Sequence, residues 1–403
     1  MLYKNKIKRQ NVLRGVMAFV FMLTLSLSTA LSPLAKAEEA KYTWKTLTSV
    51  PISDVNSFRG NYISPDGSKL FIVGTDSSYN ANLWMSADDG ATWRKIWSGR
   101  SMIERMSIST AGSKIVFLTP DNGRRHFYIS TDGGQNWTER VTSPEFLGTL
   151  ISPDGSFLTG CSVNGSVHTT YISTDDGHTW TQKGANNVSC PGYAANNGTL
   201  IAQSNGDMAK STDYGQTWTE TPNALGTNNI PSFSNNGNNI FGENRISLDG
   251  GNHWTSLNPP IPAGPNYPVY RTGISDDGKK LFINTESIFL TSVDGGRTWH
   301  SEDLLKSDTV MSNDGSKLFN VYEDNNGRLV YRVGTLPAAQ PVTPGSGAGG
   351  TVASSTGSTS ATPGQKPGKT SGRLAETGTS TWTVGGLAVI AVAAGALVLR
   401  KRL

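Results

Sequence analysis

Short apolar runs recur along residues 38–335, and tight polar turns separate them in pairs. In Ile63–Val73, for example, Ile-Ser-Pro-Asp-Gly-Ser-Lys-Leu-Phe-Ile-Val places an Asp-Gly turn between two runs of β-forming residues. This pattern predicts strand, turn and strand, because glycine readily takes the positive φ that such a turn requires. The same arrangement occurs seven times, with its glycines at Gly67, Gly112, Gly155, Gly198, Gly237, Gly278 and Gly315. The sequence therefore predicts seven hairpins.

A second motif, Ser-x-Asp-x-Gly-x-x-Trp, alternates with these hairpins. It occurs six times, with its aspartates at Asp88, Asp132, Asp175, Asp213, Asp249 and Asp294 and its tryptophans at Trp93, Trp137, Trp180, Trp218, Trp254 and Trp299. One strand is expected to end at each Ser and another to begin at each Trp. Each repeat unit then has four short strands, and four-stranded units of about 40 to 50 residues are typical of β-propeller blades.

The seventh hairpin has no Trp motif after it. The segment Tyr42–Leu47, Tyr-Thr-Trp-Lys-Thr-Leu, is similar to the strand that follows each of the six motifs. We therefore expect this N-terminal strand to become the outer strand of the last blade, where it covers an unpaired sheet edge. The expected fold class is all-β, a seven-bladed β-propeller of four-stranded blades closed by the N-terminal strand, over residues 38–335.

Composition and charge agree with a turn-rich fold and exclude some partners. The chain has 45 Gly and only 16% charged residues, which disfavours a helical bundle. Its net charge of +4 comes from the two ends, because residues 1–37 hold six basic residues, residues 378–403 hold three, and neither segment holds an acid. The remainder has 26 basic and 31 acidic side chains, which argues against nucleic-acid binding.

The N-terminal end is typical of a secretory signal peptide. Five basic residues precede an apolar run from Val16 to Leu27, and Ala35-Lys36-Ala37 gives the A-x-A arrangement of a cleavage site. Residues 1–37 are therefore expected to be removed during export. The alternative, a permanent N-terminal membrane helix, needs a longer apolar stretch.

The C-terminal end resembles the sorting signal of Gram-positive wall-anchored proteins. A Gly/Pro/Ser/Thr-rich linker (336–373) leads to an LPxTG-type pentapeptide, a hydrophobic span expected to cross the membrane (379–399) and a basic cytoplasmic tail (400–403). The pentapeptide consists of Leu374, Ala375, Glu376, Thr377 and Gly378, with Ala375 where most relatives carry Pro. The resemblance implies that a sortase cleaves after Thr377 and joins the protein covalently to peptidoglycan. The expected location is the cell wall or cell surface of a Gram-positive-type bacterium. Membrane contact is expected only through the C-terminal helix, before processing. The alternative is a membrane-anchored protein that the sortase never cleaves.

The Ser-x-Asp-x-Gly-x-x-Trp motifs resemble the Asp-box, or BNR repeat, of sialidases and other propellers. The side chains suit a structural role, in which Asp and Ser bond nearby amides and Trp packs against its neighbours. Calcium binding is the alternative, but each box offers one or two carboxylates where calcium prefers six or more oxygens. The five histidines show no ligand spacing, so neither a metal nor a cofactor is expected.

Charged residues and one tyrosine are expected to converge where the inner strands begin, beside the propeller axis. The candidates are Arg59, Glu104, Arg105, Tyr270, Arg271 and Asp308. The sialidase resemblance implies an arginine clamp for a carboxylate (Arg59, Arg105, Arg271), a tyrosine nucleophile with its base (Tyr270, Glu104) and an acid (Asp308). Against this assignment, Tyr270 and Arg271 are adjacent, so a regular strand would turn them to opposite faces. The sialidase signature is also reduced to Phe58-Arg59-Gly60-Asn61, and such sialidases usually have six blades.

Cys161 and Cys190 are expected to form a disulfide, since export permits oxidation. We place Cys161 at the end of a second strand and Cys190 at the start of the next inner strand.

Three classes of function fit these features. The first is a sortase-anchored surface protein whose propeller binds or adheres to a glycan or protein, and the second is a sialidase-like glycoside hydrolase. The third is a wall-associated structural or assembly factor. The sequence favours the first class, with the hydrolase as its alternative, so catalysis is left open but is not the preferred interpretation.

Overall fold

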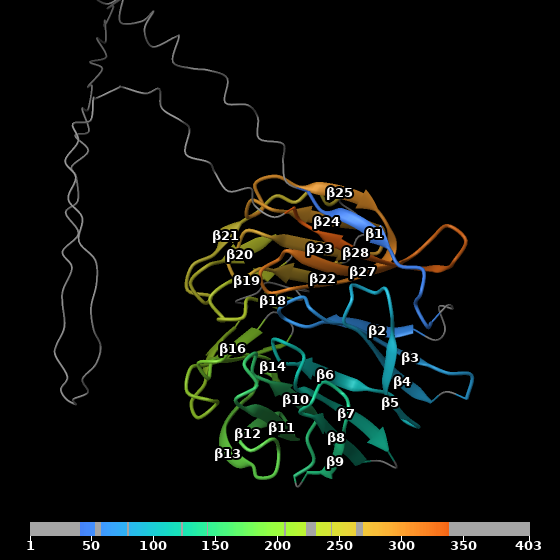
Figure 1. Cartoon of the computed structure of the whole chain (residues 1–403). Helices are drawn as coiled ribbons and strands as arrows, with labels where there is room; N and C mark the ends of the chain where they lie inside the picture. Colours follow the sequence, from blue (N-terminus) through green and yellow to red (C-terminus); the bar gives the residue numbers. More distant parts are fainter. Residues whose placement is uncertain are drawn as a thin grey trace, which may run out of the picture. The chain divides into compact units, whose positions relative to one another are not determined.

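The described part of the chain folds into seven antiparallel four-stranded sheets. The computed structural model describes residues 41–52, 58–78, 80–121, 124–142, 144–204, 207–222, 231–242, 244–262 and 269–337, and these ranges contain strands and turns but no helix. The sheets follow one another around a common centre, with the first strands of successive blades on the inside (Figure 1). The predicted seven-bladed propeller of four-stranded blades is confirmed.

Six blades take their strands in chain order from inside to outside. Blades 1 to 3 consist of β2 (Phe58–Ile63), β3 (Leu70–Thr75), β4 (Ala81–Ser86) and β5 (Arg94–Gly99); β6 (Glu104–Ile108), β7 (Ile115–Asp121), β8 (Arg124–Ser130) and β9 (Thr138–Val141); β10 (Gly148–Ile151), β11 (Leu158–Asn164), β12 (Val167–Ser173) and β13 (Thr181–Asn186). Blades 4 to 6 consist of β14 (Pro191–Ala194), β15 (Leu200–Ser204), β16 (Asp207–Ser211) and β17 (Thr219–Thr221); β18 (Ser232–Phe233), β19 (Ile240–Gly242), β20 (Arg245–Ser247) and β21 (Thr255–Ser256); β22 (Val269–Ile274), β23 (Leu281–Thr285), β24 (Ile288–Ser292) and β25 (His300–Asp303).

Blade 7 joins the two ends of the propeller. It contains β26 (Leu305–Met311), β27 (Lys317–Glu323) and β28 (Leu329–Thr335), and its outer strand is β1 (Thr43–Thr46). Trp44 lies opposite Gly334 in the antiparallel ladder between β1 and β28. The inner strand β26 in turn contacts β2 of blade 1. The predicted closure by the N-terminal strand is therefore confirmed.

The hydrophobic core is divided among the interfaces between blades. The described residues form seven buried clusters, one between each pair of neighbouring blades. Between blades 7 and 1, for example, Phe319 and Val333 pack with Ile63 and Ile72. Each of the six motif tryptophans lies against one of these clusters, and Trp44 lies against the seventh. Trp44 therefore packs against an interface core in blade 7, as the motif tryptophans do in the other six blades.

Each Asp-box is a turn held by its own side chains. In the first box the amide of Gly90 donates to Ser86 Oγ (2.9 Å), Ser86 Oγ donates to Asp88 Oδ1 (2.8 Å), and the amide of Thr92 donates to the same carboxylate oxygen (2.8 Å). Gly90 has φ +77°, a conformation that L-residues rarely adopt. The amide-to-serine bond recurs in all six boxes. The motif thus shapes the turn between the third and fourth strands.

The inner hairpins bond to one another across blade boundaries. The amide of Asn313 in blade 7 donates to Pro65 O of blade 1 (2.6 Å), and that of Asp66 donates to Thr110 O of blade 2 (3.1 Å). Lysines that follow the hairpins add to these contacts, because Lys317 Nζ reaches Gly67 O at 2.9 Å and Lys69 Nζ reaches Ala111 O at 2.6 Å. These bonds tie neighbouring blades at the hairpin end, and the sequence analysis did not identify the lysines.

Candidate functional site

The inner strands are irregular near their starts, where the candidate charged residues lie. In five of the seven blades the first strand has one residue more than its partner, so the register shifts. In blade 6, Val269 pairs with Thr285 and Arg271 pairs with Asn284, which leaves Tyr270 as the extra residue. Arg59 has the same place in blade 1. A β-bulge of this kind redirects side chains and ends the simple alternation of faces.

Two of the six candidates form an ion pair between neighbouring blades. Arg271 Nη1 of blade 6 donates to Asp308 Oδ1 of blade 7 at 2.7 Å, and both side chains are partly exposed. Tyr62 of blade 1 is close enough for both charges to act on its hydroxyl. Three successive blades therefore contribute to one polar cluster. Tyr62 was missed by the sequence analysis, although its position three residues after Arg59 on the same strand could have indicated it.

A cavity of about 350 Å³ lies beside this cluster. Its lining comes mainly from β18, β22, β26 and β2, the inner strands of four successive blades, so the cavity faces the propeller axis. Arg271 and Tyr62 are among its lining residues, and the lining continues to Ser312 and Asn313 at the hairpin end. This volume is at the lower end of the range for small-molecule sites. The cavity can therefore hold a small polar ligand.

Burial dominates the titration of the polar cluster. It raises the pKa of Tyr62, and the charge of Arg271 offsets only part of that effect. Burial also raises the pKa of Asp308, against the lowering effect of Arg271. A tyrosine nucleophile needs help to lose its proton, so a raised pKa does not favour that chemistry.

The other four candidates do not join this cluster. Glu104 Oε2 accepts from Arg125 Nε at 3.2 Å, and Tyr270 is 45% exposed with Glu286 as its acidic neighbour. The structure therefore lends no support to the pairing of Tyr270 with Glu104 as nucleophile and base, because each residue has a different partner.

The three arginines of the expected clamp do not all line the cavity. Arg59 Nη1 donates to Phe58 O of its own strand at 3.4 Å. Arg105 has φ +49° at the bulge of β6 in blade 2, away from the blades that line the cavity. Of the three arginines only Arg271 lines the cavity, because the bulges and the separation between blades keep the other two from it.

The Asp-box carboxylates accept hydrogen bonds from donors within their own turns. Hydrogen bonds from the Thr92 side chain and amide, with a further one from Ser86, lower the pKa of Asp88 to about 2. Among the residues that the structure describes, no group of three or more His, Cys, Asp or Glu side chains could hold a metal ion. The geometry thus favours the structural role of the boxes over calcium binding.

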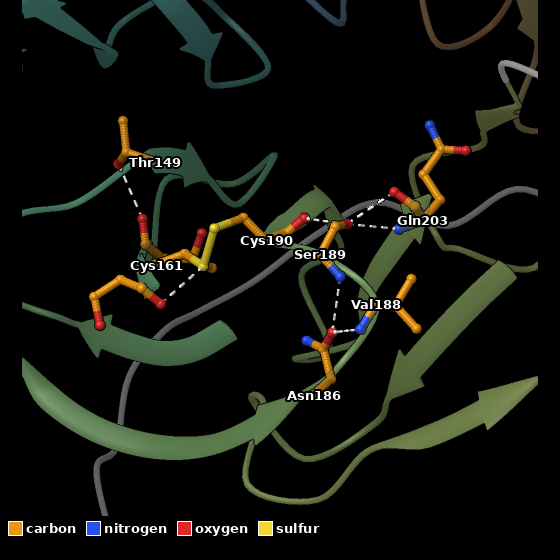
Figure 2. Close-up of a disulfide and its surroundings, with 9 residues drawn as sticks. Thr149, Cys161, Asn186, Val188, Ser189, Cys190 and Gln203 are labelled. Atoms are coloured by element: carbon orange, nitrogen blue, oxygen red, sulfur yellow. Dashed lines mark hydrogen bonds between the residues drawn. A yellow bond between two sulfur atoms is a disulfide. The ribbon is translucent and has the colours of Figure 1, made fainter. Parts of the chain in front are cut away.

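A disulfide connects blades 3 and 4 (Figure 2). It joins Cys161 to Cys190 with 5.6 Å between the Cα atoms. Cys161 is the fourth residue of β11, so its expected place at the end of that strand is wrong, whereas Cys190 directly precedes β14. Next to the bond, Ser189 Oγ donates to Gln203 O (2.8 Å) and accepts from the Gln203 amide (3.0 Å). The segment that enters blade 4 is thereby held at two adjacent residues.

Both expected targeting segments lie outside the described residues. These are the signal peptide (1–37) and the C-terminal region from residue 338 onward, which holds nearly all of the linker, the Leu374–Gly378 pentapeptide, the hydrophobic span and the basic tail. Within the residues described, no helix is long and apolar enough to cross a membrane.

Comparisons with known proteins support the repeat. A family model described as BNR/Asp-box repeat matches residues 128–139, which include the second box. The curated vacuolar protein sorting/targeting protein 10 of Pyrenophora teres f. teres (strain 0-1) is 29% identical over 131 residues, which are 31% of this chain and 9% of that protein. A chain from a structural and mechanistic study of two prolyl endopeptidases aligns with a TM-score of 0.48 at 10% identity, over 68% of this chain and 48% of the other. This chain thus carries BNR/Asp-box repeats on a seven-bladed β-propeller.

Proposed function

We propose that the protein is exported, anchored to the cell surface through the Leu374–Gly378 sorting signal, and uses its propeller to bind or adhere to a glycan or protein. A sortase would cleave after Thr377 and transfer the chain to peptidoglycan. The part of the linker from residue 338 to 373 would then separate the propeller from its attachment point by up to about 120 Å when stretched.

One observation carries this proposal: the chain enters and leaves the propeller at the same end. Tyr42 Oη donates to Gly315 O of the seventh hairpin at 2.6 Å, and the amide of Leu336 donates to Ser316 O of that hairpin at 2.9 Å. Both chain segments therefore adjoin the hairpin end, and the opposite end, where the inner strands begin, is the one that we propose for recognition. Such an arrangement suits a module that presents a surface for recognition.

The axial cavity supplies a place for a ligand without an evident catalytic group. The sialidase-like chemistry that the resemblance implies needs a tyrosine nucleophile with a carboxylate base, and a second carboxyl group as the acid. None of the described lining residues is a carboxylate, and Asp308, which accepts from the lining residue Arg271 at 2.7 Å, belongs to the polar cluster beside the cavity. Binding is therefore better supported than the sialidase-like alternative.

Anchoring and binding can be tested with the same cells. Cells that carry the full chain should adhere to at least one component of an array of glycans and surface proteins, and cells that lack it should not. Replacing Thr377 by Ala should shift the protein from the wall fraction to a detergent-extractable fraction. Unchanged wall attachment would contradict sortase transfer, and equal adhesion of both cell types would contradict the binding function. Turnover of a fluorogenic sialoside by the purified full chain would favour the hydrolase instead.

A further inference from the structure

We propose that the axial cavity binds a neutral saccharide, with the Arg271–Asp308 pair holding adjacent hydroxyl groups and the Tyr62 ring lying against the sugar. This inference rests on the proposed binding function and specifies the chemistry of its ligand. It follows from the charge, the hydrogen-bonding capacity and the size of the site.

The charge of the site favours a neutral ligand over a carboxylate. Arg271 is the only basic residue among the described lining residues, and Asp308 already compensates its charge at 2.7 Å. A carboxylate would have to compete with Asp308 for the guanidinium and would lie close to a second negative charge. With Arg59 and Arg105 placed elsewhere, the site lacks the charge that an acidic sugar requires.

The hydrogen-bonding capacity of the ion pair suits hydroxyl groups. A guanidinium has five N–H donors and a carboxylate accepts at both oxygens, whereas the Arg271–Asp308 contact uses one nitrogen and one oxygen. A hydroxyl group both donates and accepts, so one hydroxyl can accept from Arg271 while its neighbour donates to Asp308. The ion pair stays intact in this arrangement. A zwitterionic peptide end would instead have to separate its two partners.

Tyr62 adds an aromatic surface to these polar groups. Gly60 lies two residues earlier on β2, and a Cβ atom there would be 3.5 Å from Tyr62 Cε2. The Tyr62 ring thus lies over the backbone of Gly60, against the buried cluster between blades 1 and 2, and Tyr62 is among the residues that line the cavity. An aromatic face beside hydrogen-bonding groups can cover the C–H side of a sugar ring. The cavity of about 350 Å³ then suits a mono- or disaccharide better than a long polymer.

Binding can be measured by saturation-transfer NMR and calorimetry on the detergent-solubilised full chain. The neutral probes are the methyl glycosides of glucose, galactose, mannose and N-acetylglucosamine, and the charged probes are N-acetylneuraminic acid and diglycine. We expect at least one neutral probe to bind and both charged probes to bind more weakly. Absence of binding by all four neutral probes, or stronger binding of a charged probe, would overturn the inference.

Two variants and a control separate a specific role from a loss of folding. Asp308→Asn should weaken neutral-sugar binding at least about tenfold, the effect of one lost charge-assisted hydrogen bond. The same variant should strengthen binding of N-acetylneuraminic acid, because Arg271 loses its compensating charge, and an unfolded protein could not show this gain. Tyr62→Leu should weaken sugar binding, whereas Tyr62→Phe should retain most of it. The control, Lys114→Gln, removes an ion pair with Asp176 away from the cavity and should leave binding unchanged.

The outcomes also distinguish this inference from the proposed function. Sugar binding that is equal in Asp308→Asn, Tyr62→Leu and the original chain would place the saccharide elsewhere and refute the inference. If no neutral sugar binds but cells with the protein still adhere to a protein receptor, the saccharide is wrong and the binding function stands. If adhesion is also absent, both proposals fail.

Discussion

The disulfide between blades 3 and 4 should contribute measurably to stability. Cys161 and Cys190 are 29 residues apart, and cross-linking a loop of that length removes about 12 cal/mol/K of chain entropy from the unfolded state, or about 3.6 kcal/mol at 25 °C. The interface it bridges has a small core of Phe157, Ile172, Ala194 and Leu200, compared with nine buried residues between blades 7 and 1. A covalent link therefore supports an interface with few buried side chains.

The test compares the full chain with the double variant Cys161→Ala/Cys190→Ala by calorimetry. For a propeller of about 300 residues the unfolding entropy is about 0.6 kcal/mol/K, so a loss of 3.6 kcal/mol lowers Tm by about 6 °C. Reduction of the original chain should produce a similar decrease, which separates the loss of the bond from the loss of sulfur packing. A change below about 1 °C in both experiments would refute the loop-entropy reasoning. Labelling of two thiols on the folded, unreduced protein would refute the bond itself.

Two further predictions concern ring closure and the Asp-boxes. Glu302 accepts from Trp44 Nε1 (3.1 Å) and from Arg332 Nη1 (2.8 Å). Glu302→Gln should therefore lower the free energy of unfolding, measured with urea, by about 2 kcal/mol, because the charge of the buried Arg332 guanidinium is then less well compensated. Glu145→Gln, at an exposed position, is the control, and an equal decrease in both variants would contradict a specific role of Glu302 in closure. Because turn hydrogen bonds lower the pKa of Asp88 to about 2 from 3.8, its ionised form stabilises the fold fully above about pH 4, and this contribution is lost as pH falls towards 2. Asp88→Asn should make acid unfolding less steep in that window, and an unchanged acid transition would contradict this account.

Ring closure could be predicted because its signals are local and repeated. Every blade needs a hairpin glycine and a tryptophan that begins the outer strand, and the segment around Trp44 supplies the one tryptophan that blade 7 lacks. In the structure Trp44 fills this place and gains contacts that no repeat could indicate. The Arg332 guanidinium lies 3.8 Å from the centre of the Trp44 ring, and Glu302 of blade 6 bonds to both side chains. These partners come from three different strands, so only the assembled ring reveals them.

The candidate site could be predicted only in part, because its chemistry depends on bulges that sequence patterns do not reveal. The expected starts of the inner strands selected Arg271 and Asp308, and the structure places both on inner strands at the boundary of blades 6 and 7. The same inference selected Tyr270, but Tyr270 is the extra residue of its bulge and lies exposed beside Glu286. It also passed over Tyr62, which lines the cavity.

The bulges explain why neighbouring residues have separate roles at this end of the propeller. In blade 6 the extra residue lets Tyr270 lie exposed while Arg271, next in the chain, lines the axial cavity. Arg59 in blade 1 is likewise the extra residue, and it is Tyr62 on the regular part of β2 that lines the cavity. In these two blades the extra residue is absent from the cavity lining, whereas a residue later on the same strand belongs to it. A substitution of Arg59 or Tyr270 should therefore change the cavity less than a substitution of Arg271 or Tyr62.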